Sequence, residues 1–157
     1  ALDSAGAPFA IYGFSSIKNK QVRFNLLKNF AEKYSNHARG RILAVKPGFY
    51  TRMGAGIRQA TNVLLTQKSE QRLLLLISDG KPNDIDHYEG RYGIEDTRQA
   101  ILMAKKQGIQ PFCITIDEEA NDYLPYLFGE QGFAVISDIT KLPNILPKLY
   151  LNLTGLS

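Results

Sequence analysis

The side chains best suited to chemistry follow the most apolar run of this sequence of 157 residues. The run Arg72–Ser78, RLLLLIS, is followed at once by Asp79, and further acids come shortly after it at Asp84, Asp86 and Glu89. Carboxylate and hydroxyl oxygens are the ligands that Mg²⁺ prefers, and one or two carboxylates with water molecules can complete its coordination. The residues alone leave two interpretations open: a hard-cation site, or turn chemistry after a strand.

Similar side chains follow the other apolar runs. Hydroxyl and carboxylate groups stand at Ser15, Ser16, Asp117, Ser137 and Asp138. In an open parallel sheet, ligands bind beyond the carboxyl ends of the strands, so we expect these positions to share one edge. Thr51 precedes a predicted helix and should reach the same edge, unless it serves only as the helix N-cap.

The elements that must position these side chains alternate along the chain. We predict strands at residues 9–16, 22–30, 72–78, 111–117 and 133–139, and helices at 31–48, 49–65, 121–129 and 142–153. A further helix has Glu95 and Asp96 in its first turn and ends at Gly108. The run 72–78 has no polar alternation, which is typical of a strand buried on both faces. The alternation predicts one α/β domain over residues 1–157, with a doubly wound, mostly parallel sheet.

Several other chemistries are excluded. His37 and His87 are the only histidines and show no zinc spacing, while Cys113 lies in an apolar run and is expected to be buried. GFSS is not a nucleophile elbow, GAGIRQ lacks the third glycine of a dinucleotide site, and no phosphate loop is present. No catalytic or cofactor-binding residue is therefore predicted.

The net charge of +4 does not indicate a nucleic-acid partner, because the basic residues are scattered along the sequence. The apolar runs are too short to cross a bilayer. A single cysteine cannot form an internal disulfide, and nothing argues for secretion, so we expect a cytoplasmic protein.

Four stretches make a family resemblance recognisable: YTRMGAGIRQAT, LLLLISDGKPNDIDHYEGRYGIEDTRQA, FCITIDEEANDYLPYLFG and LPNILPKLY. Together they closely resemble the carboxy-terminal von Willebrand factor A domain of NorD-type proteins, the nitric-oxide reductase activation proteins of bacteria. The related CbbO proteins, which help reactivate Rubisco, share the TRMG and SDG elements. The DHYEGRYG-like loop favours the NorD side.

The resemblance implies a Rossmann-like fold with a metal-ion-dependent adhesion site. In the family pattern, a D-x-S-x-S segment, a threonine and an aspartate supply the metal ligands. The threonine falls on Thr51 and the aspartate on Asp79, whereas D-x-S-x-S has no match in this chain. We therefore expect a domain truncated at its N-terminus, without its first central strand, that binds Mg²⁺ weakly or not at all, whereas the complete domain holds it. An upstream segment or another copy of the chain would fill the sheet.

The function implied by the resemblance is that of an adaptor rather than an enzyme. An acidic side chain of a partner would complete the coordination of Mg²⁺. The implied partners are a MoxR-type AAA+ ATPase of the NorQ kind and nitric-oxide reductase. Three rivals stay open: a CbbO-like Rubisco activation adaptor, a small Mg²⁺-dependent phosphohydrolase using Asp79 and Asp84, and a structural domain without metal.

Overall fold

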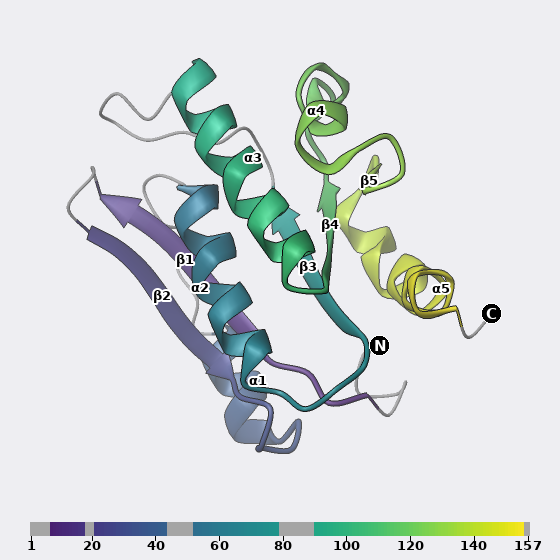
Figure 1. The fold of residues 1–157 in the computed structure, drawn as a ribbon. Coiled ribbons are helices and arrows are strands. Elements are labelled where there is room, and N and C mark those ends of the chain that lie inside the picture. The colour runs from purple at the N-terminus through teal and green to yellow at the C-terminus, as the bar shows by residue number, and fades with distance from the viewer. Residues whose placement is uncertain (1–6, 18–20, 44–51, 79–89, 156–157) are drawn as a thin grey trace. The chain divides into compact units, whose positions relative to one another are not determined.

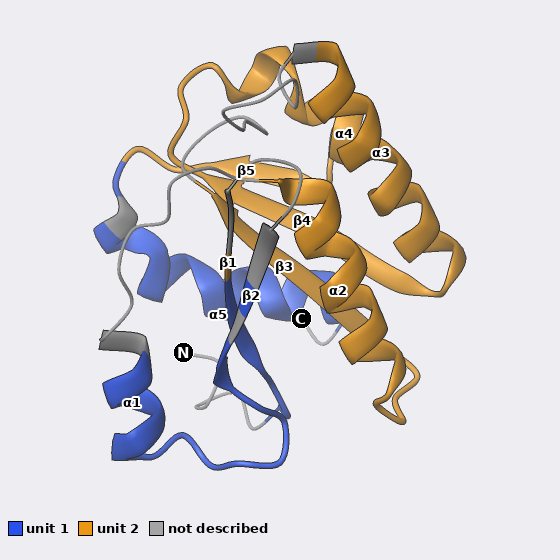
Figure 2. Ribbon diagram, turned by 90° about the vertical axis from the view of Figure 1, so that its left-hand side faces the viewer, with its two compact units in different colours: residues 1–13, 24–47, 138–157 blue, residues 14–23, 48–137 orange. Residues whose placement is uncertain are grey.

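The structure is a computed structural model that describes residues 7–17, 21–43, 52–78 and 90–155. The chain divides into two compact units, drawn in different colours in Figure 2. Unit 1 comprises residues 1–13, 24–47 and 138–157, and unit 2 comprises residues 14–23 and 48–137.

A parallel sheet of three strands forms the centre of unit 2. The strands β3 (Arg72–Ser78), β4 (Ile109–Thr115) and β5 (Phe133–Val135) follow one another in the order β3-β4-β5. Leu76 pairs with Cys113, and Cys113 with Phe133, in parallel register. The predicted parallel sheet is confirmed, and its strands alternate with helices as the sequence pattern indicates.

Helices α2 (Met53–Leu65) and α3 (Gly90–Lys106) lie beside this sheet in Figure 1. Their inward stripes meet strand residues in one buried cluster, which includes Ile57, Ile101 and Cys113. The short helix η2 (Ala120–Asp122) adds Ala120 to the cluster, and α4 (Leu124–Phe128) adds Leu124 and Phe128. Burial of such side chains is the main stabilising term of the unit.

Two further strands, β1 (Ile11–Ile17) and β2 (Gln21–Lys28), pair with each other in a separate two-stranded sheet. The rings of Tyr12 and Phe24 stack across them, with 4.4 Å between their centroids. Among the described residues, β3 is hydrogen-bonded to β4 alone, so its other edge has no neighbouring strand there. Unit 1 also contains η3 (Ile139–Lys141) and α5 (Leu142–Thr154).

Helix α1 (Asn36–Leu43) begins later than the predicted start at residue 31. Asn29 and Glu32 exchange two hydrogen bonds of 2.8 Å between side chain and backbone, which closes a turn ahead of the helix. The Ser35 hydroxyl then accepts a hydrogen bond from the Ala38 N–H at 3.4 Å, as an N-cap does. The predicted end at residue 48 lies outside the described residues.

Three local predictions were wrong. Arg52, not Thr51, is the N-cap position of α2. Helix α3 starts at Gly90, so Glu95 and Asp96 lie beyond its first turn and make side-chain contacts instead. Strand β3 is mostly half-buried rather than buried on both faces, and Ile77 is 47% exposed.

Two other predictions, the glycine that ends α3 and the burial of Cys113, are confirmed. The chain leaves α3 through Gly108, whose φ of 78° favours glycine. Cys113 is buried, and burial raises the pKa of its thiol to about 12. In the described part of the chain, no helix has the length and apolar character needed to span a membrane.

Candidate metal site

The two predicted ligands, Thr51 and Asp79, lie outside the described residues, but both are flanked by described elements of unit 2. Helix α2 begins at Met53, two residues after Thr51, and β3 ends at Ser78, directly before Asp79. In Figure 1, α2 begins at the end of the unit toward which the β3 and β4 arrows point. We call this end the carboxyl edge.

The strand ends at the carboxyl edge are fixed by pairing. Ser78 lies opposite Thr115 in the parallel register of β3 and β4. Strand β4 is buried along most of its length, and Thr115 is 1% exposed. The backbone that leads into Asp79 is therefore held by a neighbouring strand with a buried interior.

Helix α2 is held against β1 at Gly56. A Cβ atom at that position would stand 2.8 Å from Cδ2 of Phe14, closer than real contacts allow. Met53 and Gly54, in the first turn, are also buried. The close approach at Gly56 positions the end of α2 that follows Thr51.

An ion pair joins α2 to α3. The Arg58 guanidinium donates to both carboxylate oxygens of Asp96, at 3.2 and 2.5 Å, and to the Asp96 backbone carbonyl at 3.2 Å. The two residues are 38 positions apart, and no sequence pattern predicted their pairing. The pair ties together the helices that follow the two predicted ligand positions.

Asp117 is committed to the local structure after β4. Its Oδ2 accepts a hydrogen bond from the Tyr123 hydroxyl at 2.7 Å, and its Oδ1 accepts one from the Glu119 N–H at 3.0 Å. Its own N–H donates to the Thr115 hydroxyl oxygen at 3.1 Å. These three hydrogen bonds stabilise the turn after β4, so the Asp117 carboxylate serves the local structure.

Asp138 acts similarly at the start of η3. Its Oδ1 accepts a hydrogen bond from the Thr140 N–H at 2.9 Å. That backbone hydrogen bond is the main reason why the pKa of the carboxyl lies below its usual value. Ser137, the residue before it, is exposed and closes unit 2.

The other predicted oxygen donors, the side chains of Ser15, Ser16, Asp84, Asp86 and Glu89, lie outside what the structure describes, and so does His87. Within the described residues, no group of three or more His, Cys, Asp or Glu side chains could hold a metal ion. Thr51 and Asp79 would supply a hydroxyl and a carboxylate, which suit Mg²⁺.

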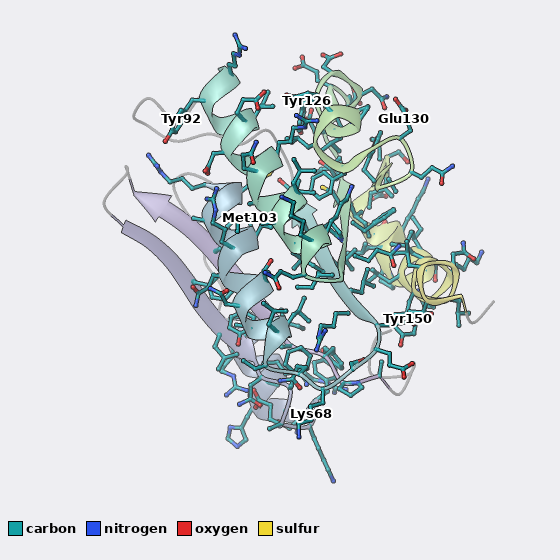
Figure 3. The ribbon with its side chains drawn as sticks, viewed as in Figure 1. Lys68, Tyr92, Met103, Tyr126, Glu130 and Tyr150 are labelled. Atoms are coloured by element: carbon teal, nitrogen blue, oxygen red, sulfur yellow. The ribbon has the colours of Figure 1, made fainter. Side chains whose placement is uncertain are left out.

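One surface cluster was missed by the sequence analysis. The Tyr126 hydroxyl donates to Glu95 at 2.5 Å, while Arg98 lies 4.3 Å from the ring centroid and donates to the hydroxyl oxygen at 3.2 Å. Figure 3 labels Tyr126 on α4, beside α3. The hydrogen bond to Glu95 is the main cause that raises the pKa of Tyr126.

Comparison with known proteins agrees with this architecture. Residues 2–148 match the von Willebrand factor type A domain. The chain belongs to this family. Protein NorD of Stutzerimonas stutzeri is 60% identical over 137 residues, which cover 87% of this chain and 22% of that protein. Protein NorD of Brucella melitensis biotype 1 is 45% identical over 152 residues, covering 97% of this chain and 24% of that protein.

A similar relative carries no functional name. An uncharacterized protein of Pseudomonas aeruginosa, PA0525, is 61% identical over 150 residues, covering 96% of this chain and 24% of that protein. This von Willebrand factor type A domain thus spans about a quarter of the length of the relatives that it matches. The resemblance to NorD-type domains is confirmed, while a relation to CbbO stays a prediction.

Proposed function

We propose that this chain is a metal-dependent protein-binding domain that helps to activate nitric-oxide reductase. The observation that carries the proposal is the 60% identity with a protein named NorD over 87% of the chain. The family assignment supports the role of an adaptor rather than an enzyme, and the absence of a recognised catalytic motif in the sequence is compatible with it.

In this proposal, Thr51 and Asp79 hold Mg²⁺ in the complete protein, together with ligands from outside residues 1–157. Bound Mg²⁺ offers a coordination position to a carboxylate oxygen of a partner. The parallel pairing at Ser78 and the buried first turn of α2 hold the described residues that border the two ligand positions. Ordered neighbours favour binding, because less conformational freedom is lost when the partner binds.

The proposed partners are a MoxR-type AAA+ ATPase and nitric-oxide reductase, and the proposed location is the cytoplasm. The ATPase would supply force, and the domain would recognise one of the two proteins and couple it to the other. The protein that carries the acidic ligand, either the ATPase or the reductase, is the one that the domain recognises through the metal.

A capture experiment tests the proposal. The full-length protein that carries this domain is immobilised, and binding of the purified ATPase and reductase is measured in Mg²⁺ or in EDTA. We expect EDTA, Thr51→Ala and Asp79→Ala each to weaken capture of the same partner. Asp122→Ala is the control, because Asp122 is exposed and far along the chain from both ligands. If EDTA and both ligand variants leave capture unchanged, metal-dependent binding of the partner is contradicted.

The edge of β3 that pairs with no described strand supports a second part of the proposal. Its backbone groups on that side need a hydrogen-bonding partner, and an apolar edge strand readily pairs with another chain. We propose that a strand from outside residues 1–157, or another copy of the chain, pairs there. Light scattering should show that residues 1–157 self-associate more than the full-length protein does. If both proteins are monomeric, pairing between copies is contradicted.

A further inference from the structure

The charge of this chain is divided unequally between its two units. Unit 1 contains seven Lys and Arg residues and three acids, a surplus of four, while unit 2 contains twelve of each. The whole net charge of +4 therefore belongs to unit 1. A single-sign surplus on one unit favours partners of the opposite charge.

The basic residues of unit 1 are densest around α1. Four residues that can carry positive charge stand within a short segment: Lys33, His37, Arg39 and Arg41. The described part of unit 1 contains two acids, Glu32 and Asp138, and Asp138 caps η3. Only Glu32 lies in the segment that leads into α1.

Glu32 is already committed to Arg41. The Arg41 guanidinium pairs with the Glu32 carboxylate, and its Nε donates to the Leu27 carbonyl at 2.8 Å. The Glu32 carboxylate also accepts a hydrogen bond from the Asn29 N–H. The hydrogen bond from Arg41 is the main cause that lowers the pKa of Glu32. Arg41 thus stabilises the local structure, and its ion pair occupies Glu32, the acid that leads into α1.

Arg39 is positioned in a different way. Its guanidinium carbon lies 4.9 Å from the centroid of the Tyr34 ring, and that ring packs 6.2 Å from the Phe9 ring. The buried Lys28 ammonium lies over Phe9, 4.1 Å from its centroid, and donates to the Phe9 carbonyl at 2.7 Å. The Tyr34 ring covers one face of the Arg39 guanidinium, while the residue stays exposed. No described residue accepts a hydrogen bond from its guanidinium.

An arginine held in this manner is suited to bind a carboxylate. A guanidinium presents several N–H donors in a planar fork that matches a carboxylate in two parallel hydrogen bonds. Stacking on Tyr34 limits the conformations of the side chain before binding, which reduces the entropy lost on association. The side chains of Lys33 and His37 are exposed, and neither makes a hydrogen bond or ion pair with a described residue.

We propose that Arg39, held on the Tyr34 ring, binds a carboxylate of an acidic segment of a partner protein, with Lys33 and His37 as further exposed basic side chains of the same short segment. The contact goes beyond the metal-dependent grip, because it needs no metal. Two permanently charged side chains and a histidine are too few for strong binding to a membrane surface or to a nucleic acid. Membrane binding through headgroups typically uses about four to eight Lys or Arg residues. Strong nucleic-acid binding uses on the order of six to ten phosphate contacts.

A peptide titration tests this proposal. The probe is a short fluorescein-labelled peptide of alternating Glu and Ser residues, and the control peptide has Gln in place of Glu. Affinity for the full-length protein is measured by fluorescence anisotropy in EDTA, at low and at physiological salt. We expect binding of the Glu peptide that weakens with salt, and about tenfold weaker binding by Arg39→Gln.

Two matched variants define specificity. Arg39→Lys keeps the charge but loses the planar fork, so its affinity should fall between those of wild type and Arg39→Gln. Lys105→Gln removes one exposed cation from the neutral unit and should change the affinity less than about twofold. Circular dichroism of each variant checks that the fold is retained.

Several results would overturn the proposal. These are no binding of the Glu peptide, equal binding of the Gln peptide, or equal losses in Arg39→Gln and Lys105→Gln. Anionic phospholipid vesicles or single-stranded DNA that bind more tightly than the peptide, and lose this binding in Arg39→Gln, would replace the acidic protein as partner. Because EDTA is present throughout, failure here is distinct from failure of the metal-dependent capture.

Discussion

Replacing Gly56 with alanine tests how closely α2 approaches β1. An alanine in a helix interior is favoured over glycine by about 1 kcal/mol, because glycine has more conformational freedom to lose on folding. Against this gain, the new Cβ would lie 2.8 Å from Cδ2 and 3.0 Å from Cγ of Phe14. Forcing an extra methyl group into such a contact costs about 1–3 kcal/mol. We therefore expect Gly56→Ala to lower the free energy of unfolding by up to about 2 kcal/mol.

Gly40 provides the matched control, because it lies in the helix α1 and a Cβ there would meet nothing within 4 Å. Gly40→Ala should raise the free energy of unfolding by about 0.5–1 kcal/mol. Urea denaturation followed by circular dichroism measures both variants, with an unchanged m-value as the condition for comparing midpoints. The two substitutions should thus differ by about 1–3 kcal/mol.

The double variant Gly56→Ala/Phe14→Leu shows whether the clash is with Phe14. Its destabilisation should be smaller than the sum of the two single losses, by about 0.5 kcal/mol or more. If Gly56→Ala stabilises the protein as Gly40→Ala does, α2 does not approach β1 as closely as described. In that case the contact with Phe14 does not position the start of α2.

Three further predictions concern single groups. Cys113 should react slowly with thiol reagents at pH 8 in the native protein and rapidly in urea, because burial raises its pKa to about 12; equal rates would contradict its burial. The pKa of Tyr126 is raised chiefly by its hydrogen bond to Glu95. This hydrogen bond therefore stabilises the folded protein fully at pH values below the ordinary tyrosine pKa of 10.0, and the stabilisation is lost as the pH rises through the higher pKa of the folded state. Ultraviolet titration of Glu95→Gln should show one tyrosine ionising at lower pH than in wild type, and unchanged curves would refute this. The pKa of Glu32 is lowered, so its contribution is present above the ordinary value of 4.5 and is lost as pH falls through the folded value. Glu32→Gln should therefore destabilise the protein at neutral pH more than in acid, and a pH-independent difference would refute the pairing with Arg41.

Much of unit 2 could be predicted because its elements carry strong local signals. The apolar run Arg72–Ser78 is bounded by polar residues, and the structure has a strand over the same range. Helix α3 ends just before Gly108, which adopts the φ that other residues avoid. The start of α1 was predicted too early, because apolar side chains recur at helical spacing from Ala31 onward. In the structure, Asn29 and Glu32 instead bond to each other across a turn.

Long-range contacts carry no such local signal. The pairing of Arg58 with Asp96 and the stacking of Arg39 on Tyr34 depend on where whole elements lie. The unequal division of charge likewise became visible only once the chain was divided into units. Thr51 and Asp79 were assigned as metal ligands from the family resemblance, and their assignment stays a prediction because both lie outside the described residues.

Direct measurement of metal binding tests the central claim, that Thr51 and Asp79 help to hold a divalent cation. Mn²⁺, which is paramagnetic and shares the preference of Mg²⁺ for oxygen ligands, can be titrated into the full-length protein and followed by electron paramagnetic resonance. We predict one bound ion per domain that Mg²⁺ displaces, loss of this ion in Thr51→Ala and Asp79→Ala, and its retention in Asp122→Ala. Residues 1–157 alone should bind it weakly or not at all. Unchanged Mn²⁺ binding in Asp79→Ala, or no binding by the full-length protein, would contradict the account.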